Sequence, residues 1–235
     1  MKNLKTYILP ISSLFLSITF LAIGYGIMIT YIGVYLKQAG VSSFSIGLIN
    51  SAFFLGAIAS SIFSQKIIST IGHIRSFASF AALMVIAFLL HSVYLNEFFW
   101  GFLRLISGFS FYALLIIVES WLNEKSSNSQ RGQILAIYTI IFYLSTALGQ
   151  LFLTIPKDSE FFVFTVGSVL VLFSLITIAM TKIKEPILKP FEQYSFPKLY
   201  SIVPLALTGS FIGGFFVGSF FTMLPLTILH KFDST

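Results

Sequence analysis

Long runs of apolar residues alternate with short polar segments along the whole chain. A transmembrane helix needs about 20 predominantly apolar residues, and runs of at least that length recur from the N-terminal region to the C-terminal end. The pattern predicts seven transmembrane helices, at roughly 8–36, 44–64, 76–95, 98–121, 132–155, 161–181 and 199–229.

The composition agrees with this pattern. Hydrophobic residues make up 57% of the chain and charged residues only 9%, whereas soluble domains carry about 25% charged residues. The 28 phenylalanines could not be hidden in one aqueous core, but helices that face lipid need no such core. The sequence therefore excludes a soluble globular protein and predicts an all-α polytopic membrane protein.

The chain has no cysteine, which excludes disulfides, thiolate metal sites and cysteine nucleophiles. It also lacks the phosphate-binding loop, the zinc-binding helix motif, the dinucleotide glycine fingerprint and the nucleophile elbow. We therefore expect no enzyme activity, no metal and no cofactor.

Basic residues are distributed unevenly between the loops, and the formal net charge is +6. One side of the predicted membrane topology carries Lys37, Lys157 and Lys231, and Arg104 lies inside a span. Because positively charged loops remain in the cytoplasm, the side with more basic residues is predicted to be cytoplasmic, together with the N-terminus. The positive charge is thus explained by membrane topology, and nucleic acid is not expected as a partner. The basic residues of that side are Lys2, Lys5, Lys66, Arg75, Lys125, Arg131, Lys182, Lys184, Lys189 and Lys198.

The segment 182–198 contains Pro186, Pro190 and Pro197 and much of the remaining charge. It is predicted to be a cytoplasmic linker that follows a six-helix unit at 1–181. Small residues recur at helix-packing spacing in the second and seventh predicted helices, which indicates ordinary tight helix packing. They are Ala52, Gly56, Ser60 and Ser64, and Gly209, Gly213, Gly214 and Gly218. The glycines of the seventh helix could also permit bending during transport.

Arg104 is the deepest charge in the predicted spans, about two turns into the fourth helix. An unpaired arginine there would be costly, so it needs a helix carbonyl, a glutamine, a substrate anion or an aromatic ring as a partner. The alternative is a packing arginine that snorkels to the outer interface. Because charges inside spans are rare, the functional interpretation is favoured two to one, as a rough weighting.

Glu119 lies on the same helix, roughly 22 Å from Arg104, so the two cannot pair directly. Glu119 and Asn123 share one helix face near the cytoplasmic end. Glu119 could close the inner mouth by pairing with Arg75 or Arg131, or carry a proton. An interfacial anchor beside Trp121 is equally compatible with the pattern.

Further polar residues fall within the predicted spans. His91 could relay protons because imidazole titrates near neutral pH, or simply hydrogen-bond at the interface. Others could line a central cavity and bind an organic solute through hydrogen bonds and ring contacts. These candidates are Tyr25, Tyr31, Asn50, Tyr112, Tyr138, Tyr143 and Gln150.

Two segments resemble motifs of the major facilitator superfamily of secondary transporters. The segment 71–75, Ile-Gly-His-Ile-Arg, is similar to the second half of the cytoplasmic motif of this family, with Gln65 and Ser69 where its first glycine and acidic residue stand. Arg104, Ser107 and Gly108 resemble the Arg-x-x-Gln-Gly signature, with serine replacing glutamine. The antiporter signature Gly-Pro-x-x-Gly-Gly has no counterpart, and the nearest residues are 147–150.

The segments 119–150 and 204–225 resemble the YcaD-type bacterial permeases of this superfamily. The resemblance implies twelve helices in two halves, with the solute bound between the halves near the midplane. Twelve spans need about 240 residues before any loop is counted, so we expect this chain to be a truncated carrier in which 199–235 holds the first helix of the second half.

The resemblance implies a permease of the bacterial inner membrane that moves a small organic solute by alternating access, with protons as a candidate coupling ion. Its expected partners are the lipid bilayer, the solute and either a complementary C-terminal half or a second copy. The rival hypothesis is a non-transporting fragment or interaction subunit. The cavity and coupling residues would be Arg104, His91 and the polar groups named above, and the cytoplasmic gate would comprise Gly72, His73, Arg75, Glu119, Asn123 and Arg131.

Overall fold

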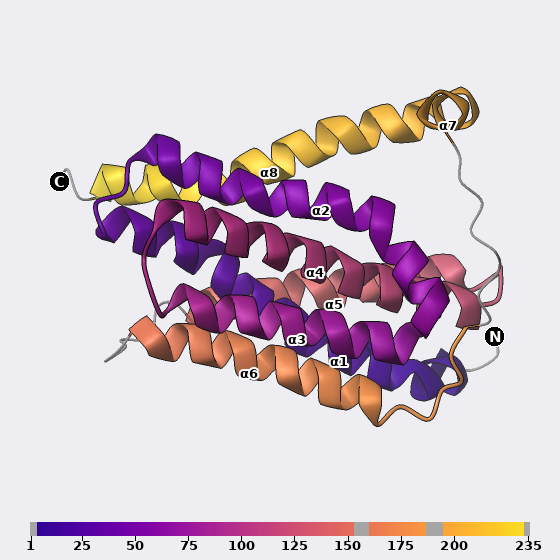
Figure 1. Cartoon of the computed structure of the whole chain (residues 1–235). Coiled ribbons are helices and arrows are strands. Elements are labelled where there is room, and N and C mark those ends of the chain that lie inside the picture. The colour runs from indigo at the N-terminus through magenta and orange to yellow at the C-terminus, as the bar shows by residue number, and fades with distance from the viewer. Residues whose placement is uncertain (1–3, 153–159, 187–194, 233–235) are drawn as a thin grey trace.

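The computed structural model describes residues 4–152, 160–186 and 195–232, and the side chains of 11–152, 161–186 and 195–218. Throughout these ranges the regular structure is helical, as predicted (Figure 1). The helices are α1 (Leu4–Gln38), α2 (Ser43–Ile71), α3 (His73–His91), α4 (Glu97–Lys125), α5 (Arg131–Leu151), α6 (Glu160–Ala179), α7 (Phe196–Ile202) and α8 (Pro204–Phe232).

Within the described residues, the first six helices are each long and apolar enough to cross a membrane. The prediction of six spans in this region is confirmed, although several boundaries differ. α2 continues to Ile71, beyond the apolar run, because polar residues such as Gln65 and Lys66 prolong the helix until Gly72. Side-chain caps mark the N-termini of α2 and α4. The side chain of Ser42 accepts a hydrogen bond from the backbone N–H of Ser45, and that of Asn96 accepts one from the backbone N–H of Phe99.

The seventh predicted span is broken rather than continuous. Helices α7 and α8 meet at an angle of 108°, with Val203 between them in a non-helical conformation. Pro204 explains the break, since proline disfavours helical geometry in the residue before it and is well tolerated at the first position of a new helix. The long membrane helix therefore begins at Pro204 instead of 199, and α7 begins inside the predicted linker. The part of that linker at 187–194 lies outside the described residues.

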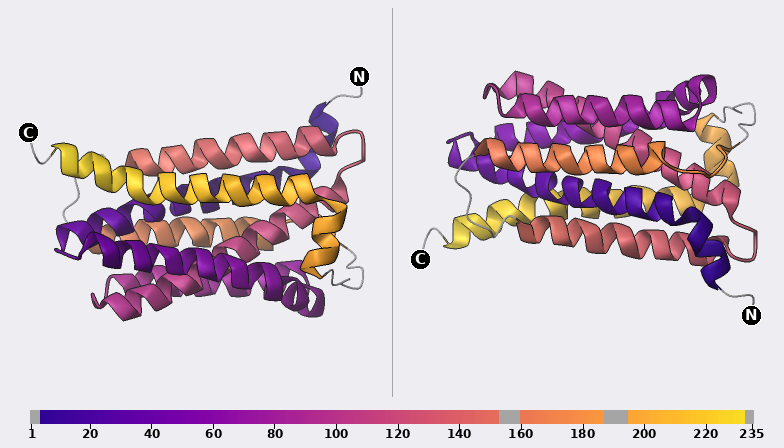
Figure 2. Two further views of the ribbon diagram at one scale, coloured as in Figure 1. Left: turned by 90° about the horizontal axis from the view of Figure 1, so that it is seen from above. Right: turned by 90° about the horizontal axis from the view of Figure 1, so that it is seen from below.

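The helices form an elongated bundle in which α1 packs against α5 and α6, and α4 packs against α2 and α3. Helix α3 also contacts α6 and closes the bundle. Figure 2 shows α8 passing over α1 between α2 and α5. The start of α1, α7 and the turn from α2 to α3 lie at one end of the bundle (Figure 1), which is the end predicted to be cytoplasmic.

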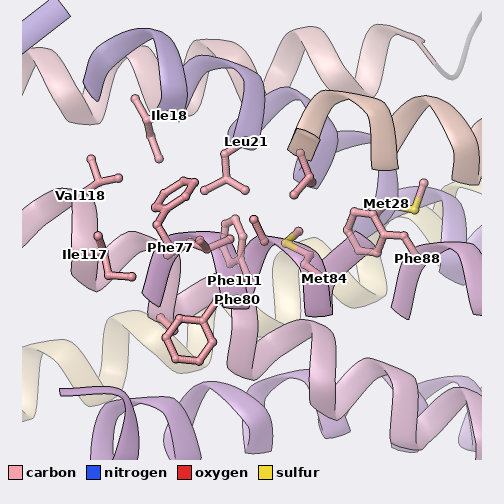
Figure 3. Close-up of a cluster of buried hydrophobic side chains, with 14 of the residues drawn as sticks. Ile18, Leu21, Met28, Phe77, Phe80, Met84, Phe88, Phe111, Ile117 and Val118 are labelled. Atoms are coloured by element: carbon pink, nitrogen blue, oxygen red, sulfur yellow. The ribbon is translucent and has the colours of Figure 1, made fainter. Parts of the chain in front are cut away.

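Close backbone contacts hold the helix pairs together. A side chain at Gly56 of α2 would overlap the Leu105 carbonyl of α4, and one at Gly108 of α4 would overlap the Phe53 carbonyl of α2. Ser60 and Ser64 are also buried along α2, so the small-residue face predicted there does pack. Large side chains of α1, α3 and α4 fill the space beside these contacts (Figure 3).

The small-residue face predicted on the last helix behaves differently. Nothing in the described chain lies within 4 Å of where a side chain would begin at Gly209, Gly213 or Gly214, and only Gly218 meets a neighbour, Phe54. The prediction of ordinary tight packing is therefore wrong for these three glycines within the described structure. Their spacing suits a helix contact, but the described structure leaves open space beside them, and Gly214 lines a groove between α2 and α8.

Candidate functional site

Arg104 lies inside the bundle with its side chain only 2% exposed, so it does not snorkel to the membrane surface. Its guanidinium carbon lies 4.5 Å from the centre of the Phe53 ring, which is the geometry of a cation–π contact. Its Nε atom has no hydrogen-bond partner among the described residues. The site thus places a full positive charge beside an aromatic face.

Aromatic rings from α1, α2, α4 and α5 gather next to this charge. Tyr25 is at the centre: its ring stacks on Phe111 with centroids 4.0 Å apart, and also approaches Phe53 at 5.9 Å and Phe142 at 6.3 Å. The charge of Arg104 also interacts electrostatically with the Tyr25 side chain. We call this set the central aromatic cluster: Tyr25, Phe53, Phe111, Tyr112, Tyr138 and Phe142.

The polar cavity candidates divide between the cluster and its margins. Tyr112 contacts Phe53 and Phe111 at 6.1 and 5.7 Å, and Asn50 is buried with its Oδ1 atom unpartnered within the described structure. Tyr143 is 54% exposed and Gln150 is partly buried, so both lie at the edge. Sequence reasoning missed the phenylalanines of the cluster, because nothing distinguishes them from the other members of a set of 28.

A second aromatic group surrounds His91, the last residue of α3. The His91 ring lies 4.9 Å from Trp100 and 6.0 Å from Phe164. Its Nδ1 donates a hydrogen bond of 2.6 Å to the Ala87 carbonyl, while Nε2 has no partner among the described residues.

At the predicted cytoplasmic end, Glu119 accepts a hydrogen bond of 2.9 Å from the hydroxyl of Tyr138. The pairing of Glu119 with Arg75 or Arg131, one of the alternatives that the sequence left open, is not formed in the described structure. Both arginines are exposed at the first turns of their helices, whereas Glu119 is turned toward α5. Asn123, one turn beyond Glu119, is partly buried.

Gly72 and His73 form the turn between α2 and α3, where Gly72 adopts a φ of +87°. The backbone N–H of His73 donates to a carboxylate oxygen of Glu185 at 2.8 Å, and the His73 ring hydrogen-bonds Ser120 at 2.9 Å. Trp121 donates from Nε1 to the carbonyl of Lys184. Sequence reasoning found Gly72 and His73 but missed Glu185 as their partner.

The part of the chain that the structure describes contains no group of three His, Cys, Asp or Glu side chains able to hold a metal ion. The region around Arg104 contains one buried cation together with the rings and tyrosine hydroxyls of the central aromatic cluster. This chemistry suits non-covalent binding of an organic molecule.

A bundle of six transmembrane helices around a buried charge and aromatic rings is the architecture of one half of a secondary transporter. The chain belongs to the Major Facilitator Superfamily, whose family model matches residues 14–235. It is a multi-pass membrane protein of this transporter family.

Curated relatives include proteins named "Uncharacterized MFS-type transporter YcaD". Those of Salmonella newport (strain SL254) and Salmonella arizonae (strain ATCC BAA-731 / CDC346-86 / RSK2980) are each 23% identical over 230 residues, which cover 97% of this chain and 60% of the relative. The chain thus spans about 60% of the length of these relatives.

The fold is similar to the crystal structure of a bacterial homolog to the human lysosomal transporter Spinster, in an inward-facing and unoccupied conformation. The TM-score is 0.58 at 16% identity, and the match covers 85% of this chain and 47% of the other. At that identity the likeness concerns the fold alone.

Proposed function

We propose that this chain forms part of a secondary active transporter of a small organic solute. The rest of the transporter would correspond to the part of its relatives that this chain does not match. In this proposal residues 1–181 form one half of an alternating-access carrier, 182–198 the linker, and 199–235 the start of the second half. The observation that carries the proposal is the buried guanidinium of Arg104 beside a cluster of rings from four helices. The solute would bind against this cluster.

The proposed gate lies at the end of the bundle that carries the α2–α3 turn, which we assign to the cytoplasm. Its residues are Gly72, His73, Arg75, Glu119, Asn123 and Arg131. The Tyr138–Glu119 hydrogen bond supports this assignment, because it joins α5 to α4 at that end. A partly buried carboxylate can also exchange a proton, so Glu119 is our candidate for proton coupling.

The test is transport by the product of the complete gene, purified and reconstituted in proteoliposomes. We expect uptake of at least one organic solute under a pH or sodium gradient, and loss of that uptake in Arg104→Ala. Lys37→Ala is the matched control, since Lys37 is an exposed cation at the opposite end of the bundle from the gate. A correctly folded protein that moves no solute under any gradient would contradict the proposal.

One observation favours a second candidate, an interaction subunit that does not transport. A Cβ atom added at Gly209, Gly213 or Gly214 of α8 would meet no described atom within 4 Å, and small residues at this spacing suit association with another helix. This candidate predicts that Arg104→Ala and Glu119→Gln leave any cellular phenotype unchanged, while Gly213→Leu abolishes it.

A further inference from the structure

Arg104 is a buried charge whose described neighbours are all neutral. Phe53 offers the face of its ring, and the Tyr25 ring lies beside Phe53. The cation–π contact with Phe53 recovers part of the cost of burying the charge. It does not supply a negative charge.

No carboxylate in the described part of the chain takes that role. The acidic residues with described side chains form no ion pair with Arg104, and Glu119 on the same helix is roughly 22 Å away and is bonded to Tyr138. A buried cation without a counter-ion is strongly disfavoured in an apolar medium. Among the described side chains, Arg104 therefore has no negative partner. The four acidic residues are Glu97, Glu119, Glu124 and Glu185.

Hydrogen-bonding capacity near this charge is also unused. The Nε atom of Arg104, the Nε2 atom of His91 and the Oδ1 atom of Asn50 belong to three different helices. Each atom is buried and has no partner among the described residues. Buried polar atoms are nearly always hydrogen-bonded in native structures, so these atoms have hydrogen-bonding capacity that a polar ligand could use.

The rings beside Arg104 define the shape of that ligand. Tyr25 and Phe111 lie nearly parallel, with 13° between their planes, and Tyr25 is 28° from both Phe53 and Phe142. Phe111 is tilted by 40° from both Phe53 and Phe142, so Tyr25 is the common stacking partner, and a further flat ring suits the same kind of offset contact. A long alkyl chain or a sugar would not use this geometry.

A route to the cluster is present on one side. A groove of about 890 Å³ lies between α2 and α8, and Tyr112 of the central aromatic cluster forms part of its wall. This volume falls within the range of small-molecule sites.

We propose that the solute is an organic anion, a carboxylate carried on a flat aromatic ring, and that Arg104 is its counter-charge. The assignment rests on the transporter function proposed above and specifies the substrate class of the same site. The carboxylate would accept hydrogen bonds from the guanidinium, and the ring would stack within the central aromatic cluster.

Benzoate is the first probe, compared with neutral benzamide and cationic benzylamine of similar size. The purified full chain in detergent is heated at increasing concentrations of each compound, and the rise in Tm gives an apparent Kd. We expect benzoate to bind about tenfold or more tightly than the other two, because only its carboxylate both accepts hydrogen bonds from Arg104 and neutralises the charge. Cyclohexanecarboxylate, equally charged but not flat, should bind more weakly than benzoate.

Two variants test the residue itself. Arg104→Gln should lose the preference for benzoate over benzamide, and Arg104→Lys should retain a reduced preference because it keeps the charge. The control Lys37→Gln, which removes an exposed cation, should bind benzoate like the wild type. If Arg104→Gln does not fold, the selectivity of the wild type and of Arg104→Lys decides the question.

Equal affinity for the three charge types, or a benzoate preference that survives in folded Arg104→Gln, would overturn the proposal. The counter-ion would then come from elsewhere in the carrier. Transport of a neutral or cationic solute without benzoate binding would also overturn it, while leaving the transporter function intact. Conversely, selective benzoate binding without transport of any solute would contradict the transporter function and support the anion site.

Discussion

A carboxylate oxygen of Glu185 lies 2.8 Å from the backbone nitrogen of His73, although the residues are 112 positions apart in the chain. The His73 N–H is one of the unpaired donors at the start of α3, so the carboxylate caps that helix and complements the positive end of its dipole. The neighbouring carbonyl of Lys184 accepts a hydrogen bond from Trp121 of α4. The segment that follows α6 is therefore attached to α3 and α4 at the end assigned to the gate.

Replacing Glu185 by alanine removes this cap. We expect Glu185→Ala to lower the free energy of unfolding by about 1 kcal/mol, and Glu185→Gln to lower it less, because the amide oxygen can still accept the hydrogen bond. Hydrogen exchange of the His73 amide in detergent should become faster in the same order. Glu124→Gln is the control, as it removes an exposed carboxylate at the end of α4. An unchanged His73 amide in Glu185→Ala would contradict the capping role.

Gly72 is required at this turn for two separate reasons. Its φ of +87° and ψ of 169° belong to a region that is essentially restricted to glycine, and a Cβ atom there would lie 2.8 Å from the Glu185 carboxylate. We expect Gly72→Ala to cost about 1–3 kcal/mol, measured by chemical unfolding in mixed micelles. Gly101→Ala should be neutral or slightly stabilising, because this helical glycine has open space around it. Equal stability of the two variants would rule out a strained turn.

Gly108 brings the backbones of α4 and α2 together. A Cβ atom at this position would overlap the carbonyl of Phe53, so Gly108→Ala must push the two helices apart. We expect a loss of about 1–3 kcal/mol from overpacking, and a lower Tm in detergent. The cation–π contact of Arg104 with Phe53 should weaken as well, since both residues belong to the same helix pair.

The control for this prediction is Gly213→Ala. Gly213 is also helical, but no described atom lies within 4 Å of the position that a Cβ atom would take there, so Tm should remain within experimental error or rise slightly. If Gly108→Ala were tolerated as well as Gly213→Ala, the close approach of α2 and α4 would not be needed for stability.

Hydropathy predicted the six spanning helices because a membrane helix must satisfy its backbone internally over a fixed length. It did not predict where α2 ends, since Gln65 and Lys66 are polar yet continue the helix beyond the apolar run. It also missed the break before Pro204, where a local backbone rule overrides the apolar pattern. The ends of these helices therefore depend more on helix caps and on the backbone restriction imposed by proline than on hydrophobicity.

The candidate site was only partly predictable. A single charge in an apolar run was enough to select Arg104, because burying a charge is rare and costly. Its aromatic neighbour Phe53 could not be selected, since the contact depends on how α2 packs against α4. Glu185 was missed for the same reason: its partner is remote in sequence, and no local pattern identifies a carboxylate that caps a distant helix.

The hydrogen bond from Tyr138 to Glu119 gives the sharpest test of the proposed gate. Tyr138→Phe leaves a partly buried carboxylate without this donor, and we expect a loss of about 1.5–3 kcal/mol, the usual range for hydrogen bonds to charged groups. Glu119→Ala removes the acceptor, and the double variant should cost less than the sum of the two, because both single changes remove the same interaction. Thermal unfolding of the four proteins measures this coupling, with Tyr143→Phe as the control, since that exposed tyrosine lies on the same helix. If the costs of the two single changes simply add, the contact contributes nothing to stability. If transport by the complete gene product is also unaffected by Tyr138→Phe, the gate does not depend on it.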